Sequence, residues 1–163
     1  MSTAPAAKLV EPGQGKTLSL FAVGFDYKVT SADSGGALSA LEVTIPPGTL
    51  VKPHNHSRED EFTYVLAGTV GARVGDRVVE AGAGASMVKP RGIPHAMWNV
   101  GPEPARVLEV VAPGGLEDYF EDLAPALRAK MPPAEYDALA ARYGLTIVNE
   151  WIEELERTYK VKL

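Results

Sequence analysis

The sequence predicts a mainly β protein, a sandwich or barrel of short strands followed by a helical C-terminal segment. Glycine and proline, 16 and 13 residues, mostly divide the first two thirds of the chain into short segments rich in Val, Leu, Ile, Thr and aromatics. Such regular spacing is typical of all-β sandwiches and barrels. After Pro113-Gly114-Gly115, apolar residues recur at helical spacing instead. We therefore expect an N-terminal arm and β domain over residues 1–115, with a helical extension packed on it over residues 116–163.

The expected strands all lie before residue 112. Between Val74 and Arg77, glycine and aspartate form the tip of a tight hairpin. The strands are expected at Thr17–Val23, Tyr27–Thr30, Ala37–Ile45, Phe62–Ala67, Thr69–Val74, Arg77–Val79, Ser86–Lys89, His95–Val100 and Arg106–Val111.

The extension is expected to contain amphipathic helices. The first begins at Leu116–Leu123, and Pro125 should end it or begin another, because proline lacks the backbone N–H that a helix interior needs. A second helix is expected over Ala134–Tyr143, with Gly144 as its C-terminal stop, and a short third over Glu150–Tyr159. We interpret their apolar faces as packing against the β domain. The alternative is that the first helix forms a lid over a pocket mouth.

Composition excludes several classes of function. With 163 residues and 45% apolar residues, the chain can bury one core without help from a metal or disulfides. Cysteine is absent, which removes disulfides, thiolate ligands and cysteine nucleophiles. The net charge of −5, with no run of basic residues, disfavours nucleic acid and anionic membrane surfaces as partners. Neither a signal peptide nor a membrane span is visible, so we expect a cytoplasmic protein.

All three histidines suit a single metal site. His54 and His56 are two residues apart, so in a strand they point to the same face. His95 follows a bend containing two prolines and a glycine, at the start of another expected strand. Imidazole and carboxylate are the ligands expected for a transition metal in a protein without thiolates. The alternative is that the three histidines are unrelated, hydrogen-bonded residues, which would require three independent coincidences of position.

Three carboxylates compete for the fourth ligand position. Glu61 directly precedes the apolar strand, and the polar turn before it breaks strict strand alternation, which allows Glu61 to face the histidines. Glu59 and Asp60 are expected to lie solvated in that turn.

Two segments, residues 48–68 and 84–99, resemble the paired signatures of the cupin superfamily. Every fixed position of both signatures is filled: Gly48, His54, His56, Glu61 and Gly68, then Gly84, Pro90, Gly92, His95 and Asn99. Ten matched positions make the resemblance far more specific than a lone short motif. The chain looks like a small monocupin of the quercetin 2,3-dioxygenase-like group. The resemblance implies a single jelly-roll β-barrel with a helical C-terminal extension.

The resemblance also implies a metal centre and a chemistry. His54, His56, Glu61 and His95 would hold one divalent ion of iron, nickel, manganese, cobalt, copper or zinc. In octahedral geometry two positions stay open, one for a substrate oxygen and one for water or dioxygen. Glu61 would be the catalytic general base, and strand alternation makes Thr63, Val65 and Met97 the expected substrate-lining residues. The side chains expected to belong to the barrel packing instead are Phe62, Tyr64 and Trp98.

Three functions fit this centre. The first is a dioxygenase acting on an aromatic or enolisable small molecule. The second is an isomerase, cyclase or lyase that uses the metal but no oxygen. The third is a non-catalytic protein that binds a small molecule. Similar proteins often form homodimers through their N-terminal strands, and Thr17–Val23 is the segment expected to do so.

Overall fold

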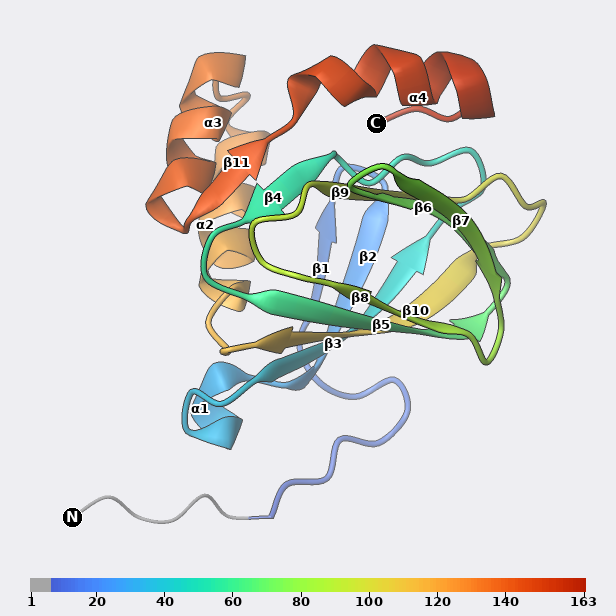
Figure 1. Cartoon of the computed structure of the whole chain (residues 1–163). Coiled ribbons are helices and arrows are strands. Elements are labelled where there is room, and N and C mark those ends of the chain that lie inside the picture. Colours follow the sequence, from blue (N-terminus) through green and yellow to red (C-terminus); the bar gives the residue numbers. More distant parts are fainter. Residues whose placement is uncertain (1–6) are drawn as a thin grey trace.

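The computed structural model describes residues 7–163, so the first six residues of the expected N-terminal arm lie outside the described part. Two antiparallel sheets face one another and the C-terminal helices pack around them (Figure 1). The first sheet has the order β1-β2-β3-β10-β5-β8, and the second has the order β11-β4-β9-β6-β7. This confirms the mainly β, jelly-roll fold class. The sheets form a sandwich and do not close into a complete barrel, which is a small difference.

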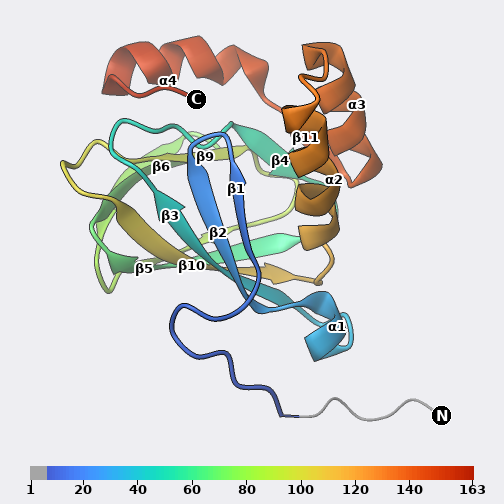
Figure 2. The same ribbon diagram turned by 180° about the vertical axis from the view of Figure 1, so that it is seen from behind.

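The strands follow the predicted spacing closely. Their bounds are β1 Thr17–Leu20, β2 Val23–Val29, β3 Ser39–Ile45, β4 His54–His56, β5 Asp60–Ala67, β6 Thr69–Val74, β7 Arg77–Gly82, β8 Ser86–Lys89, β9 His95–Trp98, β10 Ala105–Ala112 and β11 Leu145–Ile147. The predicted hairpin tip is confirmed, since β6 ends at Val74 and β7 begins at Arg77. Several boundaries differ by a few residues, and the largest difference is at the first two strands: the chain turns at Phe21, where φ is +53°, and β2 begins at Val23, before Tyr27. Figure 2 shows β1, β2 and β3 side by side in the six-stranded sheet.

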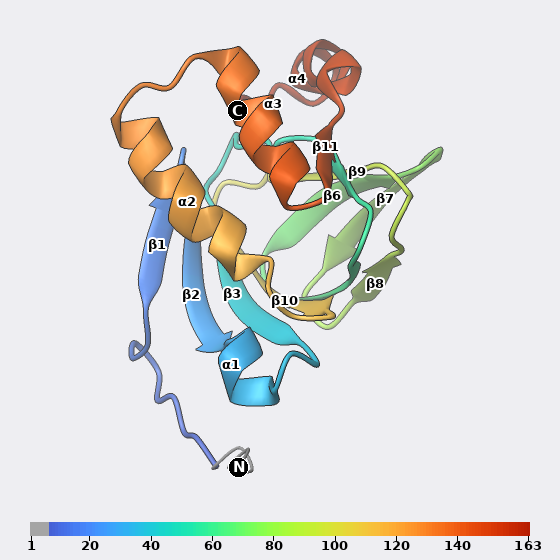
Figure 3. The same ribbon diagram turned by 90° about the vertical axis from the view of Figure 1, so that its left-hand side faces the viewer.

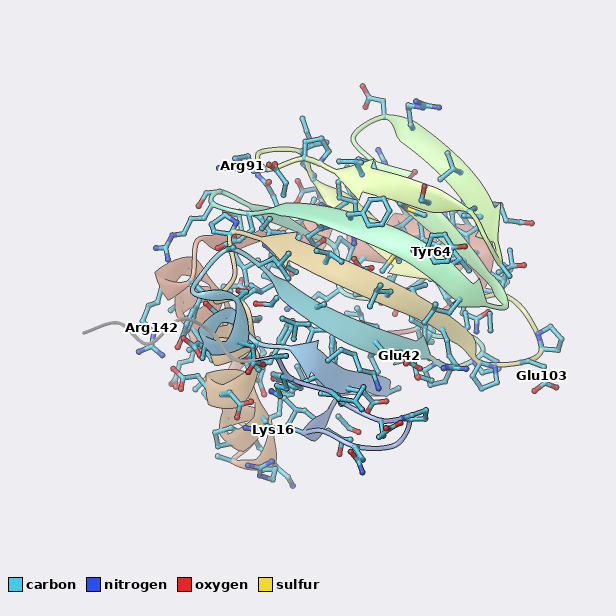
Figure 4. The ribbon with its side chains drawn as sticks, turned by 90° about the horizontal axis from the view of Figure 1, so that it is seen from below. Lys16, Glu42, Tyr64, Arg91, Glu103 and Arg142 are labelled. Atoms are coloured by element: carbon cyan, nitrogen blue, oxygen red, sulfur yellow. The ribbon has the colours of Figure 1, made fainter. Side chains whose placement is uncertain are left out.

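The main core lies between the two sheets and depends on strict alternation along β5. Val65 points inward and is fully buried, whereas Phe62 and Tyr64 point outward and are 39% and 40% exposed. Figure 4 shows Tyr64 on the outer face of the six-stranded sheet. The expectation that Phe62 and Tyr64 belong to the barrel packing was therefore wrong. Once Glu61 faces inward, the period of two places both aromatic rings on the outside.

Helices α2 (Glu117–Arg128) and α3 (Pro133–Arg142) lie beside β1 and β11, respectively (Figure 3). Pro125 sits inside α2, so the expectation that it ends or begins a helix was wrong. The proline itself is exposed, so its ring displaces no residue of the core. The apolar face of α2 packs on β1, and this packing holds the helix together across the proline. Gly144 follows α3 with φ +78°, as predicted for a C-terminal stop.

The last helix, α4 (Ile152–Tyr159), follows the 3₁₀ turn η1 (Asn149–Trp151) and packs on the outer face of the five-stranded sheet. Beneath it Trp98 is 2% exposed and stacks on Tyr159, with ring centroids 4.3 Å apart. The expectation that Trp98 contributes to packing is confirmed. Among residues 7–163, no helix is both long and apolar enough to cross a membrane.

Two elements were not expected from the sequence. The short helix α1 (Ser31–Ser34) is closed by a capping box between Thr30 and Asp33. Strand β11 lies within the C-terminal extension but joins the five-stranded sheet, where Leu145 pairs with His56 and Ile147 with His54. The extension therefore contributes directly to the sheet that carries the histidines.

Replacing Glu117 by glutamine is expected to lower the free energy of unfolding by about 2–3 kcal/mol at pH 7. The carboxylate is 6% exposed and accepts hydrogen bonds from the backbone of Ser31 and Gly115 and from the Ser39 hydroxyl, which ties α2 to the sheet. Burial alone would raise the pKa of Glu117, but these hydrogen bonds outweigh it and lower the pKa below its ordinary 4.5. The contribution is thus present above pH 4.5 and is lost as the pH falls through the folded-state pKa.

Urea unfolding of the wild type and of Glu117→Gln, at a series of pH values, measures this contribution. The difference in free energy of unfolding between the two proteins should become smaller below pH 4.5. A difference in free energy of unfolding that does not change with pH would mean that the charge of Glu117 does not contribute to stability.

Candidate metal centre

The four residues singled out in the sequence meet between the two sheets. His54 and His56 lie on β4 and His95 on β9, and His54 and His95 are cross-strand partners in the five-stranded sheet. Glu61 approaches from β5 of the opposite sheet. One candidate ligand atom from each of these four residues lies within 4.8 Å of all the others. Positions spread over some forty residues of sequence thus converge on one point.

Each imidazole is oriented through its Nδ1 atom. His54 Nδ1 lies 2.7 Å from the carbonyl oxygen of Lys52, and His95 Nδ1 lies 3.1 Å from that of Ile93. A carbonyl oxygen can only accept a hydrogen bond, so Nδ1 carries the proton in both rings and Nε2 presents its lone pair. His56 Nδ1 faces the Glu59 carboxylate at 3.4 Å. Partners of this kind are the ones that fix the ring and tautomer of metal-binding histidines.

The donor set fits a divalent metal. The Nε2 atoms of His56 and His95 are buried and make no hydrogen bond. His95 Nε2 lies 3.0 Å from Glu61 Oε2 without hydrogen-bond alignment, so the two atoms face a common point. Ligands at right angles, each about 2.1 Å from one ion, lie about 3 Å apart. Unpartnered buried nitrogen atoms are costly unless they bind something.

The surroundings of His54 and His95 favour neutral imidazoles and those of Glu61 favour a charged carboxylate, as a metal requires. Burial, and then the neighbouring His95 and His56 rings, hold the pKa of His54 well below its ordinary 6.5. Burial likewise lowers the pKa of His95. For Glu61, burial alone would raise the pKa, but the Lys89 ammonium and the adjacent imidazoles outweigh it and hold the pKa well below 4.5.

Two buried charged residues beside Glu61 were missed in the sequence. Lys89 Nζ lies 2.9 Å from Glu61 Oε2 and 3.0 Å from Glu109 Oε2. The Thr63 hydroxyl lies 2.9 and 3.0 Å from the two oxygens of Glu109. The available signal was a lone charge in an apolar strand, most clearly Glu109 within the run from Val107 to Val111.

The structure separates the two rival carboxylates. Asp60 is half-exposed and forms a bidentate pair with Arg91, which lowers the pKa of Asp60 to about 2. Glu59, expected to be solvated, is only 7% exposed and lies behind His56. That expectation was wrong because the Glu59 side chain points inward, toward the His56 ring.

The remaining signature residues shape the loops around the centre. Gly92 has φ +78° and donates its N–H to the His56 carbonyl oxygen at 2.7 Å, which links the two histidine segments. Asn99 is buried, and its side-chain amide donates to the carbonyl oxygens of Ile45 and Glu103 at 2.8 and 2.9 Å. Asn99 is therefore a structural residue and holds the loop after β9 in place.

A cavity of about 310 Å³ extends from the four residues toward α2. Its inner end is polar, with Lys89 and Glu109 beside the histidines, and its other walls are largely apolar. Of the residues expected to line it, Met97 does, whereas Thr63 and Val65 are buried but do not form its wall. The N-cap residue Leu116 and Tyr119, Phe120 and Leu123 of α2 also line the cavity, and most of them are buried in the packing with β1. The first helix of the extension is therefore both packing and cavity wall.

Known proteins share this fold. Residues 41–111 match the family model of the cupin domain. KdgF from Halomonas sp. superimposes with a TM-score of 0.62 at 17% identity, covering 69% of this chain and 99% of that one. A predicted oxalate decarboxylase from Thermotoga maritima gives a TM-score of 0.60 at 21% identity, covering 64% of this chain and 98% of that one. The oxalate decarboxylase of Lactobacillus farciminis, in complex with formate, gives 0.58 at 19% identity, covering 90% of this chain and 39% of that one.

These identities are low and establish the fold alone. No curated protein shows significant sequence similarity to the chain. Residues 41–111 are thus similar to the cupin domain, and the solved structures share the fold of this chain.

Proposed function

We propose that His54, His56, Glu61 and His95 hold one divalent transition metal and that the protein is a dioxygenase of the quercetinase-like type. Its substrate would be an aromatic or enolisable small molecule. The observation that carries the proposal is the convergence of three imidazoles and one carboxylate at the inner end of a largely apolar cavity. Iron, nickel, manganese, cobalt, copper and zinc all accept this donor set.

The residues around the centre have separable roles. A bound divalent ion supplies Lewis acidity, which lowers the pKa of a substrate hydroxyl. Glu61 is the proposed base. Lys89 binds its Oε2 atom, which leaves Oε1 to accept the hydroxyl proton. The aromatic rings of Phe25, Tyr119 and Phe120 pack against the substrate and exclude water from the cavity.

Protein loaded with iron, nickel or manganese is expected to consume oxygen when supplied with flavonols or β-diketones. An oxygen electrode measures the rate, after elemental analysis has shown which metal the purified protein retains. The matched control is the same metal at the same concentration without protein. Uptake no faster than this background, over the whole substrate panel, would count against the dioxygenase.

A second candidate is a metal-dependent isomerase, cyclase or lyase that uses no oxygen, and the buried Glu109 favours it. Burial, and the nearby Glu61 charge, raise the pKa of Glu109 to about 7 although Lys89 opposes this. A carboxyl of that pKa on the cavity wall can hold or release a proton at neutral pH, which isomerisation and elimination require. Product formation that is unchanged under strict anaerobiosis would select this candidate. Tight binding of a ligand that is never converted would instead indicate a binding protein.

The homodimer and the cytoplasmic location stay predictions. In support of the former, β1 lies at the edge of the six-stranded sheet, where a second copy can add a strand. Light scattering at micromolar concentration tests it, and a monomer mass would contradict it.

A further inference from the structure

Lys89 places an ammonium group in the interior of the sandwich. It is 2% exposed and is the cross-strand neighbour of Glu61, so both side chains point toward the cavity from adjacent strands. Burial of an ammonium group in such a place is strongly unfavourable unless the group is paired. Here it has two carboxylate partners, Glu61 on β5 and Glu109 on β10, at 2.9 and 3.0 Å.

Glu109 is itself held in place. It pairs with Thr63 across β5 and β10, and the Thr63 hydroxyl lies within hydrogen-bond distance of both of its oxygens. Side chains on three neighbouring strands thus form one continuous series of polar contacts, from Thr63 through Glu109 and Lys89 to Glu61. It ends on the carboxylate that faces the three imidazoles.

Stability does not account for this arrangement. Replacing a buried ion pair by apolar side chains of similar volume is often neutral or stabilising. The two carboxylates instead keep the ammonium charged. Burial alone would lower the pKa of Lys89, but Glu109 and Glu61 outweigh it and raise the pKa.

We propose that Lys89 is a positioning residue that holds the Glu61 carboxylate against the three imidazoles, with Glu109 and Thr63 holding Lys89. This rests on the metal site proposed above. Without Lys89, Glu61 loses the partner of its Oε2 atom and its side chain can turn away from the histidines. Removing an outer partner of a metal ligand typically lowers metal affinity by about 10–100-fold.

The deciding variant is the double substitution Lys89→Met/Glu109→Gln, because it removes both charges and leaves neither buried alone. Co²⁺ is the probe, and its binding is titrated by calorimetry and by visible absorption. The d–d bands of bound Co²⁺ report the ligand geometry. We expect a folded protein with Co²⁺ affinity about 10–100-fold below that of the wild type and with altered bands. The single variant Glu109→Gln keeps the Lys89–Glu61 contact and should weaken binding less.

The matched control is Lys28→Met, which removes one lysine charge on β2. Lys28 lies 3.6 Å from Glu42, and Glu42 keeps Arg106 as a second partner. This control should bind Co²⁺ like the wild type and give the same spectrum.

The two proposals fail in different ways. Wild-type protein that does not bind Co²⁺ would overturn the metal site itself. If the wild type binds and the double variant matches its affinity and spectrum, then Lys89 only neutralises Glu109 and the positioning role is overturned. An equal loss in Glu109→Gln and in the double variant would assign the effect to Glu109 and would also overturn it.

Discussion

His56→Ala and His95→Ala are each expected to abolish metal retention while the protein stays folded. Each variant removes an Nε2 donor that is buried and has no hydrogen-bond partner. Because loss of an outer partner alone costs about 10–100-fold in affinity, loss of a ligand should cost more than about 100-fold. The folded state should survive, because the main core between the sheets is apolar and does not include these residues.

Elemental analysis after dialysis measures the retained metal, and circular dichroism follows the fold of the same samples. Asn55→Ala is the matched control, since Asn55 lies on β4 between His54 and His56 and its side chain points to the opposite face. It should retain metal like the wild type. Unfolding of the metal-free His56→Ala or His95→Ala protein would show that the fold depends on the site, and full metal retention would remove that residue from it.

Trp98→Ala is expected to lower the free energy of unfolding by about 3–5 kcal/mol, the usual cost of removing a large buried aromatic ring. The indole fills the space between the five-stranded sheet and α4, together with Leu50, Leu155 and Val161. It lies so close over Gly71 that a Cβ atom there would be 2.1 Å from the indole Nε1. The space is therefore shaped for this ring, and surrounding residues cannot easily fill it.

Equilibrium urea unfolding measures this loss. Val100→Ala, a truncation two residues away at a side chain that is 49% exposed, should change stability by no more than about 0.5 kcal/mol. A loss below about 1.5 kcal/mol for Trp98→Ala would mean that α4 moves into the space left by the indole or contributes little to stability.

The sequence was most informative where a local rule decides the outcome. Strand alternation placed His54 and His56 on one face, and the cupin resemblance added His95 and Glu61. The sequence alone therefore predicted all four residues of the candidate site. Alternation also separated Phe62 and Tyr64 from Thr63 and Val65, but it could not show that the outer face of β5 is left partly uncovered, so the expected packing of the two rings was wrong. They follow an inward-facing Glu61 and must point outward, whatever their apolar character suggests.

The features that were missed depend on pairing between distant segments. Lys89 and Glu109 meet only because β8, β5 and β10 lie side by side in one sheet, and their register cannot be read from local pattern. Strand β11 has three residues, too few for a periodic signal, and it exists because β4 provides its partner. Pro125 lies inside α2 because packing on β1 outweighs local helix preference.

The pairing of β11 with β4 has a consequence for biosynthesis. The strand that carries His54 and His56 has β9 on one side and β11 on the other. During translation, the first neighbour emerges soon after the histidines, but the second emerges only once residues 145–147 have left the ribosome. A nascent chain would therefore complete the strand pairing around the candidate site only after residues 145–147 have been synthesised, long after the two histidines of β4.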